Sequence, residues 1–223
     1  MTAAPAAPHV LLINPNSSAA TTQMMLQIAI AKAAGRLGID TATATRSPTM
    51  IVNEAELAAS EAEVIALARA ARPDCKGIII SAFGDPGVTV LQSELDIPVI
   101  GLCEASMIVA AQNGRRFGIA TVTPDLAGVI ARRAASLGLA DLYTGIRCPP
   151  GDPLTLARDP AGLQQALAAA TRLAIRDGAE AVIIGGGPLG QAAEALQHQY
   201  AVPIIAPISS AVRLMIETLE RKA

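Results

Sequence analysis

The chain has 223 residues, a formal net charge of −2 and 52% apolar residues, of which very few are aromatic (2% of the chain). This length allows one large domain or two lobes of about 100 residues each. The small negative charge and the lack of aromatic stacking platforms argue against a nucleic-acid partner. No apolar run approaches the ~18 residues that a membrane span needs, so we expect no membrane partner either.

The first residues of the chain and its cysteines give an expectation for the cell compartment. The opening stretch MTAAPAAP has neither the basic region nor the apolar region of a signal peptide. The cysteines, Cys75, Cys103 and Cys148, are odd in number and form no C-x-x-C pair, which favours a reducing cytoplasm. Without a cluster of cysteines and histidines, we expect no metal site.

The first half of the chain alternates short apolar runs with helical patterns. Residues 9–14 (HVLLIN) predict a strand buried on both faces. Ser17 or Ser18 can cap the helix that follows, and Gly38 is expected to end it. Further along this half we predict strands at 41–46, 77–82 and 98–103 and helices at 54–71 and 87–95.

The second half repeats this scheme around a Pro/Gly-rich connection at 147–153. We predict strands at 116–122, 181–186 and 203–208 and helices near 125–137, 160–177 and 189–199. Strands that alternate with helices form parallel, doubly wound sheets. The predicted fold class is therefore α/β, with a parallel sheet flanked by helices in each half.

An internal repeat supports two lobes. The offset from Gly77 to Ala181 is 104 residues, and the offset from Pro98 to Pro203 is 105 residues. A weaker match places residues 10–16 and residues 117–123 at an offset of 107 residues. A period this long indicates two domain-sized units. We expect one lobe to contain 8–103 together with 206–223, and the other to contain 104–205.

Four turns follow predicted strands and precede helices, at residues 14–18, 82–87, 121–124 and 185–190. Such turns lie at the carboxyl edge of a parallel sheet, where ligands bind. Their backbone N–H groups point from the positive end of a helix and can hold an anion or a developing enolate. Any one of these turns, taken alone, is more simply explained as an ordinary turn containing Gly and Pro. Four such turns at equivalent positions of the repeat favour a site between the lobes. The expected binding residues are Asn14, Asn16, Ser17, Ala82, Phe83, Gly84, Thr121, Thr123, Gly186, Gly187 and Pro188.

Three side chains near these turns are candidates for catalysis. Asp85 lies in the second turn and could act as a base if buried, although an acid here also serves as a helix cap. Cys103 ends a predicted strand at the correct edge, although a buried cysteine is also a common core residue. Glu104 could orient a substrate group or could hold the two lobes together.

The stretch at 185–190 satisfies the G-x-G-x-x-G pattern of dinucleotide sites. Such a site also needs an acidic residue at the end of the next strand. That strand ends at Ala206-Pro207-Ile208-Ser209 without one. We therefore expect no nicotinamide cofactor.

Several motifs together resemble the aspartate/glutamate racemase superfamily, especially its hydantoin and allantoin racemase branch. They are INPNSS (13–18), FGDPG (83–87), PVIGLCEA (98–105), the T-x-T turn at 121–123 and DGAEAVIIGG (177–186). The resemblance runs from Val10 to Val212. It implies two αβ lobes, no cofactor, a small-molecule substrate between the lobes, and self-association into a homo-oligomer.

The resemblance also implies two cysteines that face each other across the substrate, one removing the Cα proton and the other returning it. This chain departs from the pattern at both positions, with Ala82 directly before FGDPG and Gly186 in the later glycine turn. Neither residue can carry a proton. Since one acid–base group contributes about 10²–10⁴ in rate, two-thiol racemisation should be lost.

Three functions remain open. The first is a family-type isomerase or related enzyme that forms a carbanion or enolate beside a carbonyl of a small carboxylate, imide or ureide. The second is a hydrolase, lyase or decarboxylase with one base, Asp85 or Glu104. The third is a binding protein that has kept the lobes and lost the chemistry.

Overall fold

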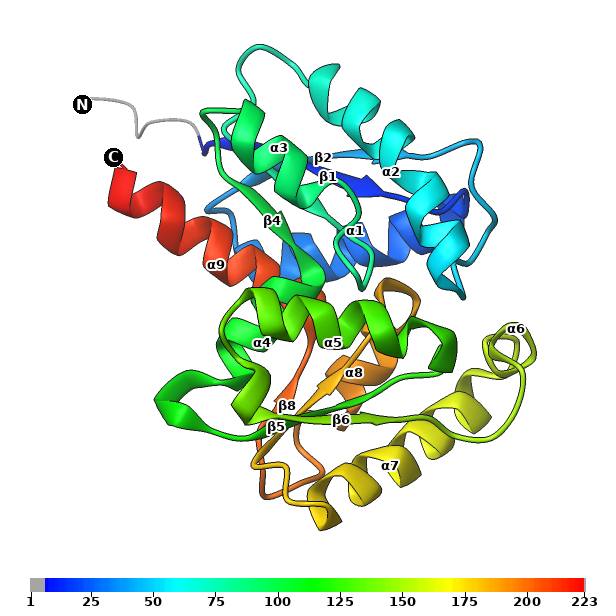
Figure 1. Cartoon of the computed structure of the whole chain (residues 1–223). Coiled ribbons are helices and arrows are strands. Elements are labelled where there is room, and N and C mark those ends of the chain that lie inside the picture. Colours follow the sequence, from blue (N-terminus) through cyan, green and yellow to red (C-terminus); the bar gives the residue numbers. More distant parts are fainter. Residues whose placement is uncertain (1–6, 223) are drawn as a thin grey trace.

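The computed structural model describes residues 7–222, which form two α/β lobes packed against each other (Figure 1). Each lobe is built on a four-stranded parallel sheet, with the order β2-β1-β3-β4 in the first lobe and β6-β5-β7-β8 in the second. The two orders are equivalent. In each sheet, the first strand along the chain lies between the second and the third, and the fourth strand lies beside the third. The predicted α/β class is confirmed, and the sequence repeat corresponds to a repeat of topology.

The first lobe begins with β1, which pairs with β2 on one side and with β3 on the other. Its elements are β1 (His9–Asn14), α1 (Ala19–Ala33), β2 (Gly38–Thr43), α2 (Glu54–Arg69), β3 (Gly77–Ile80), α3 (Val88–Glu94) and β4 (Val99–Gly101). The three residues Ile78, Ile79 and Ile80 are fully buried, as expected for a strand covered by helices on both faces.

The second lobe repeats this plan around β5, which pairs with β6 and β7. Its elements are β5 (Phe117–Ala120), α5 (Ala127–Ser136), β6 (Tyr143–Arg147), α6 (Pro153–Leu156), α7 (Pro160–Arg176), β7 (Ala181–Ile184), α8 (Gly190–Leu196) and β8 (Ile204–Ile205). Short 3-10 turns at Pro124–Leu126 and Gly187–Leu189 precede α5 and α8. These turns leave the sheet at its carboxyl edge.

Two helices join the lobes. The helix α4 (Leu102–Ala110) follows β4 and contacts α5, β7 and β8 of the second lobe. The last helix, α9 (Pro207–Lys222), follows β8 and returns to pack on α1, α4 and β3. The expected lobe boundary between residues 103 and 104 falls inside α4. Within residues 7–222, no helix has the length and apolar character needed to cross a membrane.

Some predicted elements differ from the structure, and the largest difference is at the end of β4. We predicted a strand through 98–103, but the strand ends at Gly101 and a helix begins at Leu102. The carboxylate of Asp85 accepts the N–H groups of Cys103 and Glu104, both at 2.8 Å, and so caps this helix. The cap comes from a residue distant in sequence, which the local pattern does not reveal.

Other differences concern an edge strand and a helix end. The sequence pattern gave no strand at β6, where Gly145 has a φ of 102°. The register with β5 shifts there, so the strand has an irregularity instead of clean alternation. The helix α1 ends at Ala33, before the predicted stop at Gly38, because Ala34 adopts a left-handed conformation with a φ of 48°. Gly38 is instead the first residue of β2 and pairs with His9.

Candidate functional site

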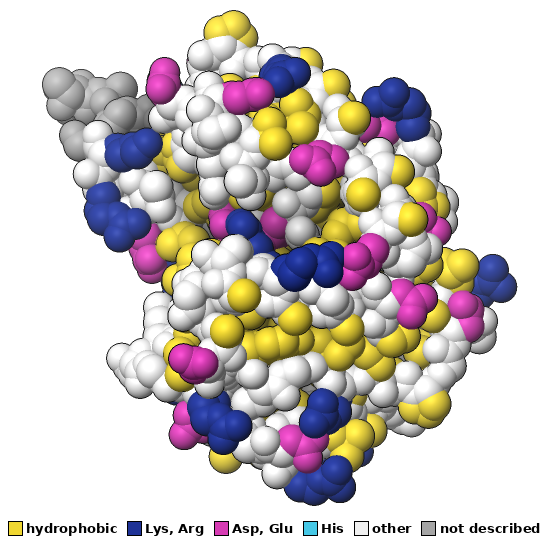
Figure 2. Space-filling model, viewed as in Figure 1, with side chains coloured by type: hydrophobic (Ala, Val, Ile, Leu, Met, Phe, Trp, Pro, Cys, Tyr) yellow, Lys and Arg dark blue, Asp and Glu magenta, His cyan; other side chains and the backbone are white. Residues whose placement is uncertain are grey.

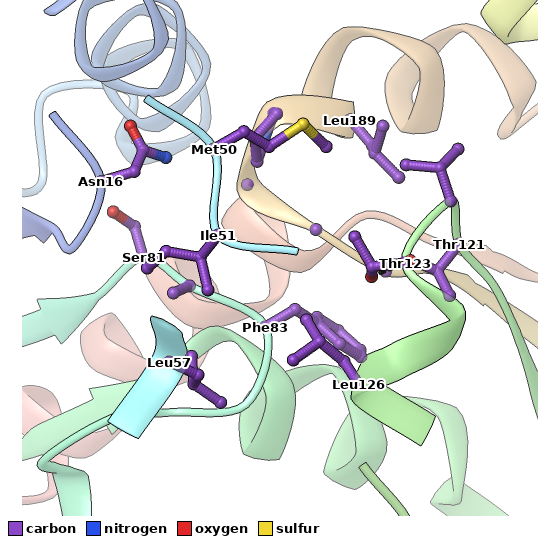
Figure 3. Close-up of a pocket in the computed structure, with 16 residues that line it drawn as sticks. Asn16, Met50, Ile51, Leu57, Ser81, Phe83, Thr121, Thr123, Leu126 and Leu189 are labelled. Atoms are coloured by element: carbon purple, nitrogen blue, oxygen red, sulfur yellow. Dashed lines mark hydrogen bonds between the residues drawn. The ribbon is translucent and has the colours of Figure 1, made fainter. Parts of the chain in front are cut away.

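A pocket of about 40 Å³ lies between the lobes, at the carboxyl edges of both sheets (Figure 3). The first lobe contributes the turns after β1 and β3 and the connection from β2 to α2. The second lobe contributes the turns after β5 and β7. The lining residues are Asn16, Met50, Ile51, Leu57, Ser81, Ala82, Phe83, Thr121, Val122, Thr123, Leu126, Gly185, Gly186, Gly187, Pro188 and Leu189.

The turn after β1 is organised by Asn14, which is fully buried and does not line the pocket. Its Nδ2 donates to Oδ1 of Asn16 at 2.9 Å and to Oγ1 of Thr22 at 2.9 Å, and its Oδ1 accepts the N–H of Asn16. A buried amide with these partners fixes the loop in one conformation. Ser17 also lies outside the pocket lining, and its N–H donates to the carbonyl of Pro48.

Asn16 presents a hydrogen-bond donor to the pocket. Its Oδ1 accepts from Asn14 and from the N–H of Ser18 at 3.0 Å. A backbone N–H can only donate, so this contact sets the orientation of the amide. The Nδ2 of Asn16 has no hydrogen-bond partner within residues 7–222, and Figure 3 shows it turned towards the pocket. It is therefore free to donate to a ligand.

The turn after β3 brings the first lobe against the second. Ser81 Oγ donates to the carbonyl of Ile13 at 2.6 Å, which commits this hydroxyl to the core. The ring of Phe83 lies so close to Gly185 that a Cβ added there would be 3.0 Å from the ring. A Cβ on Gly187 would be 2.7 Å from the carbonyl oxygen of Ser81. Small residues in the second lobe therefore allow the two turns to meet.

The turns of the second lobe add hydroxyl groups and backbone donors. Thr121 and Thr123 are buried, and their Oγ1 atoms lie 3.1 Å apart. Gly186 has φ 134° and ψ 136°, a backbone conformation that is essentially restricted to glycine. Within the described chain, the N–H groups of Ala82, Phe83 and Gly186 donate no hydrogen bond to another backbone or side-chain group. The pocket therefore combines unpaired amide donors from both lobes.

The lining carries no charged or readily titratable side chain among the described residues: its polar side chains are one amide and three hydroxyls. The remaining side chains are aliphatic or aromatic, or absent at glycine. An uncharged, largely apolar pocket disfavours a ligand with two negative charges, because no cationic side chain in its lining pairs with them. The arrangement favours a small ligand with carbonyl groups and little net charge.

The structure brings many of the predicted binding residues to this pocket. They are Asn16, Ala82, Phe83, Thr121, Thr123, Gly186, Gly187 and Pro188. Gly84 lies on the opposite face of its turn, where it lines a separate groove. The two positions at which the resembled family places thiols, Ala82 and Gly186, thus both face the pocket.

The three candidate catalytic side chains, Asp85, Cys103 and Glu104, lie outside the pocket lining. The Asp85 carboxylate caps α4 and accepts a hydrogen bond from Arg133 Nε at 3.1 Å. Arg133 also pairs with Glu104, whose Oε1 accepts the N–H of Gly101 at 3.1 Å. Arg133 belongs to α5 of the second lobe, so this cluster ties the lobes together. We had not identified Arg133 from the sequence, where it is one arginine in a polar helix.

Burial raises the pKa of two groups in and beside this cluster. Burial, followed by the nearby charge of Glu104, raises the pKa of Asp85 to about 7. Burial and the nearby Asp85 also raise the pKa of the Cys103 thiol well above its usual value. Cys103 is completely inaccessible and packs in the apolar core with Met107 and Phe117. Its thiolate form is therefore disfavoured.

The sequence did not reveal the lining residues Met50, Ile51 and Leu57. They belong to the connection between β2 and α2 and to the start of α2, which reach over the pocket from the first lobe. No motif marks them, and their apolar side chains match any amphipathic helix start. In the described chain, no three His, Cys, Asp or Glu side chains gather as a possible metal site.

The fold and the pocket define a two-lobed α/β protein that can hold a small molecule between repeated parallel sheets. The sequence model described as Asp/Glu/Hydantoin racemase matches residues 10–215, and the chain belongs to this family. This confirms the resemblance drawn from the motifs.

Relatives and solved structures agree with this assignment. The chain is 29% identical to a hydantoin racemase of Rhizobium meliloti, over 92% of this chain and 86% of that protein. The structure matches allantoin racemase from Pseudomonas fluorescens with a TM-score of 0.88 and 25% identity, covering 96% of this chain and 91% of that one. It matches allantoin racemase from Klebsiella pneumoniae with a TM-score of 0.87 and 28% identity, covering 96% and 88%.

Proposed function

We propose that this chain is a cofactor-independent enzyme that binds a small cyclic ureide or imide between its lobes and stabilises the enolate formed beside a carbonyl. The observation that carries the proposal is the pocket lining, in which the described residues supply unpaired amide donors from both lobes and no charged side chain. Relatives named hydantoin and allantoin racemases support a ureide as ligand. A small monocarboxylate is the other ligand that amide donors suit.

Backbone donors can promote Cα–H ionisation without a side-chain base. As the proton leaves, negative charge develops on the carbonyl oxygen, and preorganised N–H groups stabilise that charge. The Nδ2 of Asn16 supplies a further donor on the side of the first lobe. The proton passes to water, because Ala82 and Gly186 offer none of the usual thiols. Exchange should therefore be slower than in a two-thiol enzyme by about 10²–10⁴ for each missing group.

A second function, binding without turnover, is favoured by one specific observation. Among residues 7–222, the pocket lining contains no acidic, basic or thiol side chain that could accept the Cα proton. A protein that binds the same ureide and leaves it unchanged would need only the amide donors and the apolar walls. The two functions share the ligand and differ in whether the Cα hydrogen exchanges.

Hydrogen exchange in D₂O separates them. We expect hydantoin and allantoin to raise the melting temperature of the protein and to exchange the Cα hydrogen faster with protein than in buffer. Stabilisation without faster exchange would assign binding alone. Stabilisation by aspartate or glutamate, with none by either ureide, would contradict the proposed ligand class.

Two variants test the role of Asn16. Asn16→Asp keeps the oxygen that Asn14 and Ser18 bind and removes the free donor, so affinity for the ureide should fall by about tenfold. Ser17→Ala is the matched control in the same turn, because Ser17 lies outside the pocket lining. Isothermal titration of both variants measures the difference. Equal affinities would show that the Asn16 amide does not contact the ligand.

A further inference from the structure

A second cavity of about 280 Å³ lies beside the pocket, as a groove between α2, the turn after β3 and α5. It is lined by Glu54, Leu57, Ala58, Glu61, Gly84, Asp85, Pro86, Gly87, Thr89, Val129 and Arg132. An ion pair between Arg132 and Glu54, at 2.8 Å, spans it from one lobe to the other. Charged side chains of both signs lie along this seam in Figure 2.

Leu57 is the one residue shared by the linings of the pocket and the groove. On both sides of Leu57, one segment of the chain lines the pocket and then the groove. Phe83 lines the pocket and Gly84 lines the groove, and Leu126 and Val129 do the same one helical turn apart. The Leu57 side chain therefore lies between the two cavities and acts as a partition at this point.

The packing around Gly84 shows how closely this partition fits. A Cβ added to Gly84 would lie 2.6 Å from Cδ2 of Leu57 and 3.4 Å from Cγ1 of Val129. The leucine thus occupies the space that the missing side chain leaves, and it is only 5% exposed. Removing its branched end would open a path from the pocket into the groove.

We propose that Leu57 is a specificity-determining residue that limits the length of the group carried by the ligand's reacting carbon. This inference rests on the proposed ureide function and adds its size limit. The pocket is small, at about 40 Å³, and we expect a long substituent to extend past Leu57 into the groove. Beyond Leu57, the groove is large enough to receive a flexible chain or a ring.

The experiment compares two hydantoins, one carrying a methyl group and one carrying a phenylethyl group at the reacting carbon. Leu57→Ala should bind the phenylethyl compound at least about tenfold more tightly than the wild type does, because the ring gains contacts with the apolar groove residues Ala58, Pro86 and Val129. Its affinity for the methyl compound should stay within about threefold of the wild type. Leu57→Val, a smaller truncation, should change the ratio of the two affinities by less. It keeps the test available if Leu57→Ala does not fold.

A matched control enlarges the groove without removing the partition. Val129→Ala widens only the groove, because Val129 does not line the pocket. It should not change the ratio of the two affinities by more than about threefold. A ratio unchanged in Leu57→Ala, or raised equally in Val129→Ala, would overturn the proposal.

A crystal structure of Leu57→Ala separates this inference from the proposed function. If no hydantoin binds any form of the protein, the proposed function fails whatever Leu57 does. One continuous cavity in the variant would still support Leu57 as the partition. Collapse of neighbouring side chains into the space would overturn it.

Discussion

The turns after β3 and β7 occupy equivalent places in the two lobes and share one backbone feature. Gly84 in the first turn and Gly186 in the second have φ of 133° and 134°, values that other residues rarely adopt. The first turn is also fixed by side-chain bonds, through Asp85 to α4 and to Arg133 of the other lobe. At the two positions where the family places thiols the turns differ, because Ala82 already carries a Cβ, whereas a Cβ at Gly186 would strain the backbone. Equivalent positions in a repeat can therefore differ in which substitutions they tolerate.

This difference predicts an unequal response to restoring a thiol, which is the largest effect we expect. Ala82→Cys places a sulfur at the pocket on an ordinary backbone and should raise Cα hydrogen exchange of hydantoin by about 10²-fold or more. Gly186→Cys, the matched variant, should give no such gain, because its backbone must first rearrange. Exchange in D₂O measures both. Equal gains would show that the two turns are interchangeable.

A substitution at Arg133 removes side-chain bonds that help to fix the first turn and leaves the second turn unchanged. Arg133→Met leaves two buried carboxylates without their cation and should lower the free energy of unfolding by about 3–5 kcal/mol. The control is Arg132→Met, one residue away, whose exposed pair with Glu54 should contribute no more than about 1 kcal/mol. Urea denaturation compares the two variants. Similar losses would mean that the buried cluster does not hold the lobes.

Gly186→Ala addresses the second turn. A Cβ at this φ requires backbone strain, so the free energy of unfolding should fall by about 2–3 kcal/mol. Gly114→Ala is the control, since Gly114 has a φ of 71° and open space around its Cβ position. That change should cost only about 1 kcal/mol. Thermal unfolding that ranks the two variants in the opposite order would contradict the role given to Gly186.

The smallest predicted effect, counted per pH unit, is a pH dependence that belongs to the first turn. Because the pKa of Asp85 is raised to about 7 in the folded state, the folded protein keeps a proton that the unfolded chain has already lost. The free energy of unfolding should therefore fall as pH rises from about 4 to about 7, by at most about 1.4 kcal/mol per pH unit.

Asp85→Asn should remove this slope, and the exposed Asp125→Asn should leave it in place. Urea denaturation at a series of pH values measures the slope in each protein. A slope that survives in Asp85→Asn would assign it to other groups. A slope absent from the wild type would show that Asp85 stays ionised.

Much of the fold was predictable from the sequence, because its strands are recognisable without tertiary information. The buried runs at β1, β3 and β7 are continuous in apolar residues, and the rule that ligands bind at the carboxyl edge led directly to Asn16, Ala82 and Gly186. The helix α4 was not predictable, since its cap is supplied by Asp85 from another turn. The strand β6 was missed because Gly145 interrupts its alternation.

The site was less predictable than the fold. Leu57 reaches the pocket only because α2 begins beside the turn at Gly84, and this contact depends on the packing of the whole first lobe. Arg133 acquires its role only when α5 of one lobe meets two carboxylates of the other. The residue types of Asp85 and Glu104 suggested catalytic groups. Their hydrogen bonds and ion pairs instead connect the start of α4 to Arg133 of α5.

The chain passes between the lobes twice, at the start of α4 and again at the start of α9, and the two helices pack side by side. Two neighbouring connections of this kind restrict how the lobes can separate. A ligand that needs the lobes to part would require a rotation about α4 and α9, and such a rotation would open the interface where α2 faces α5.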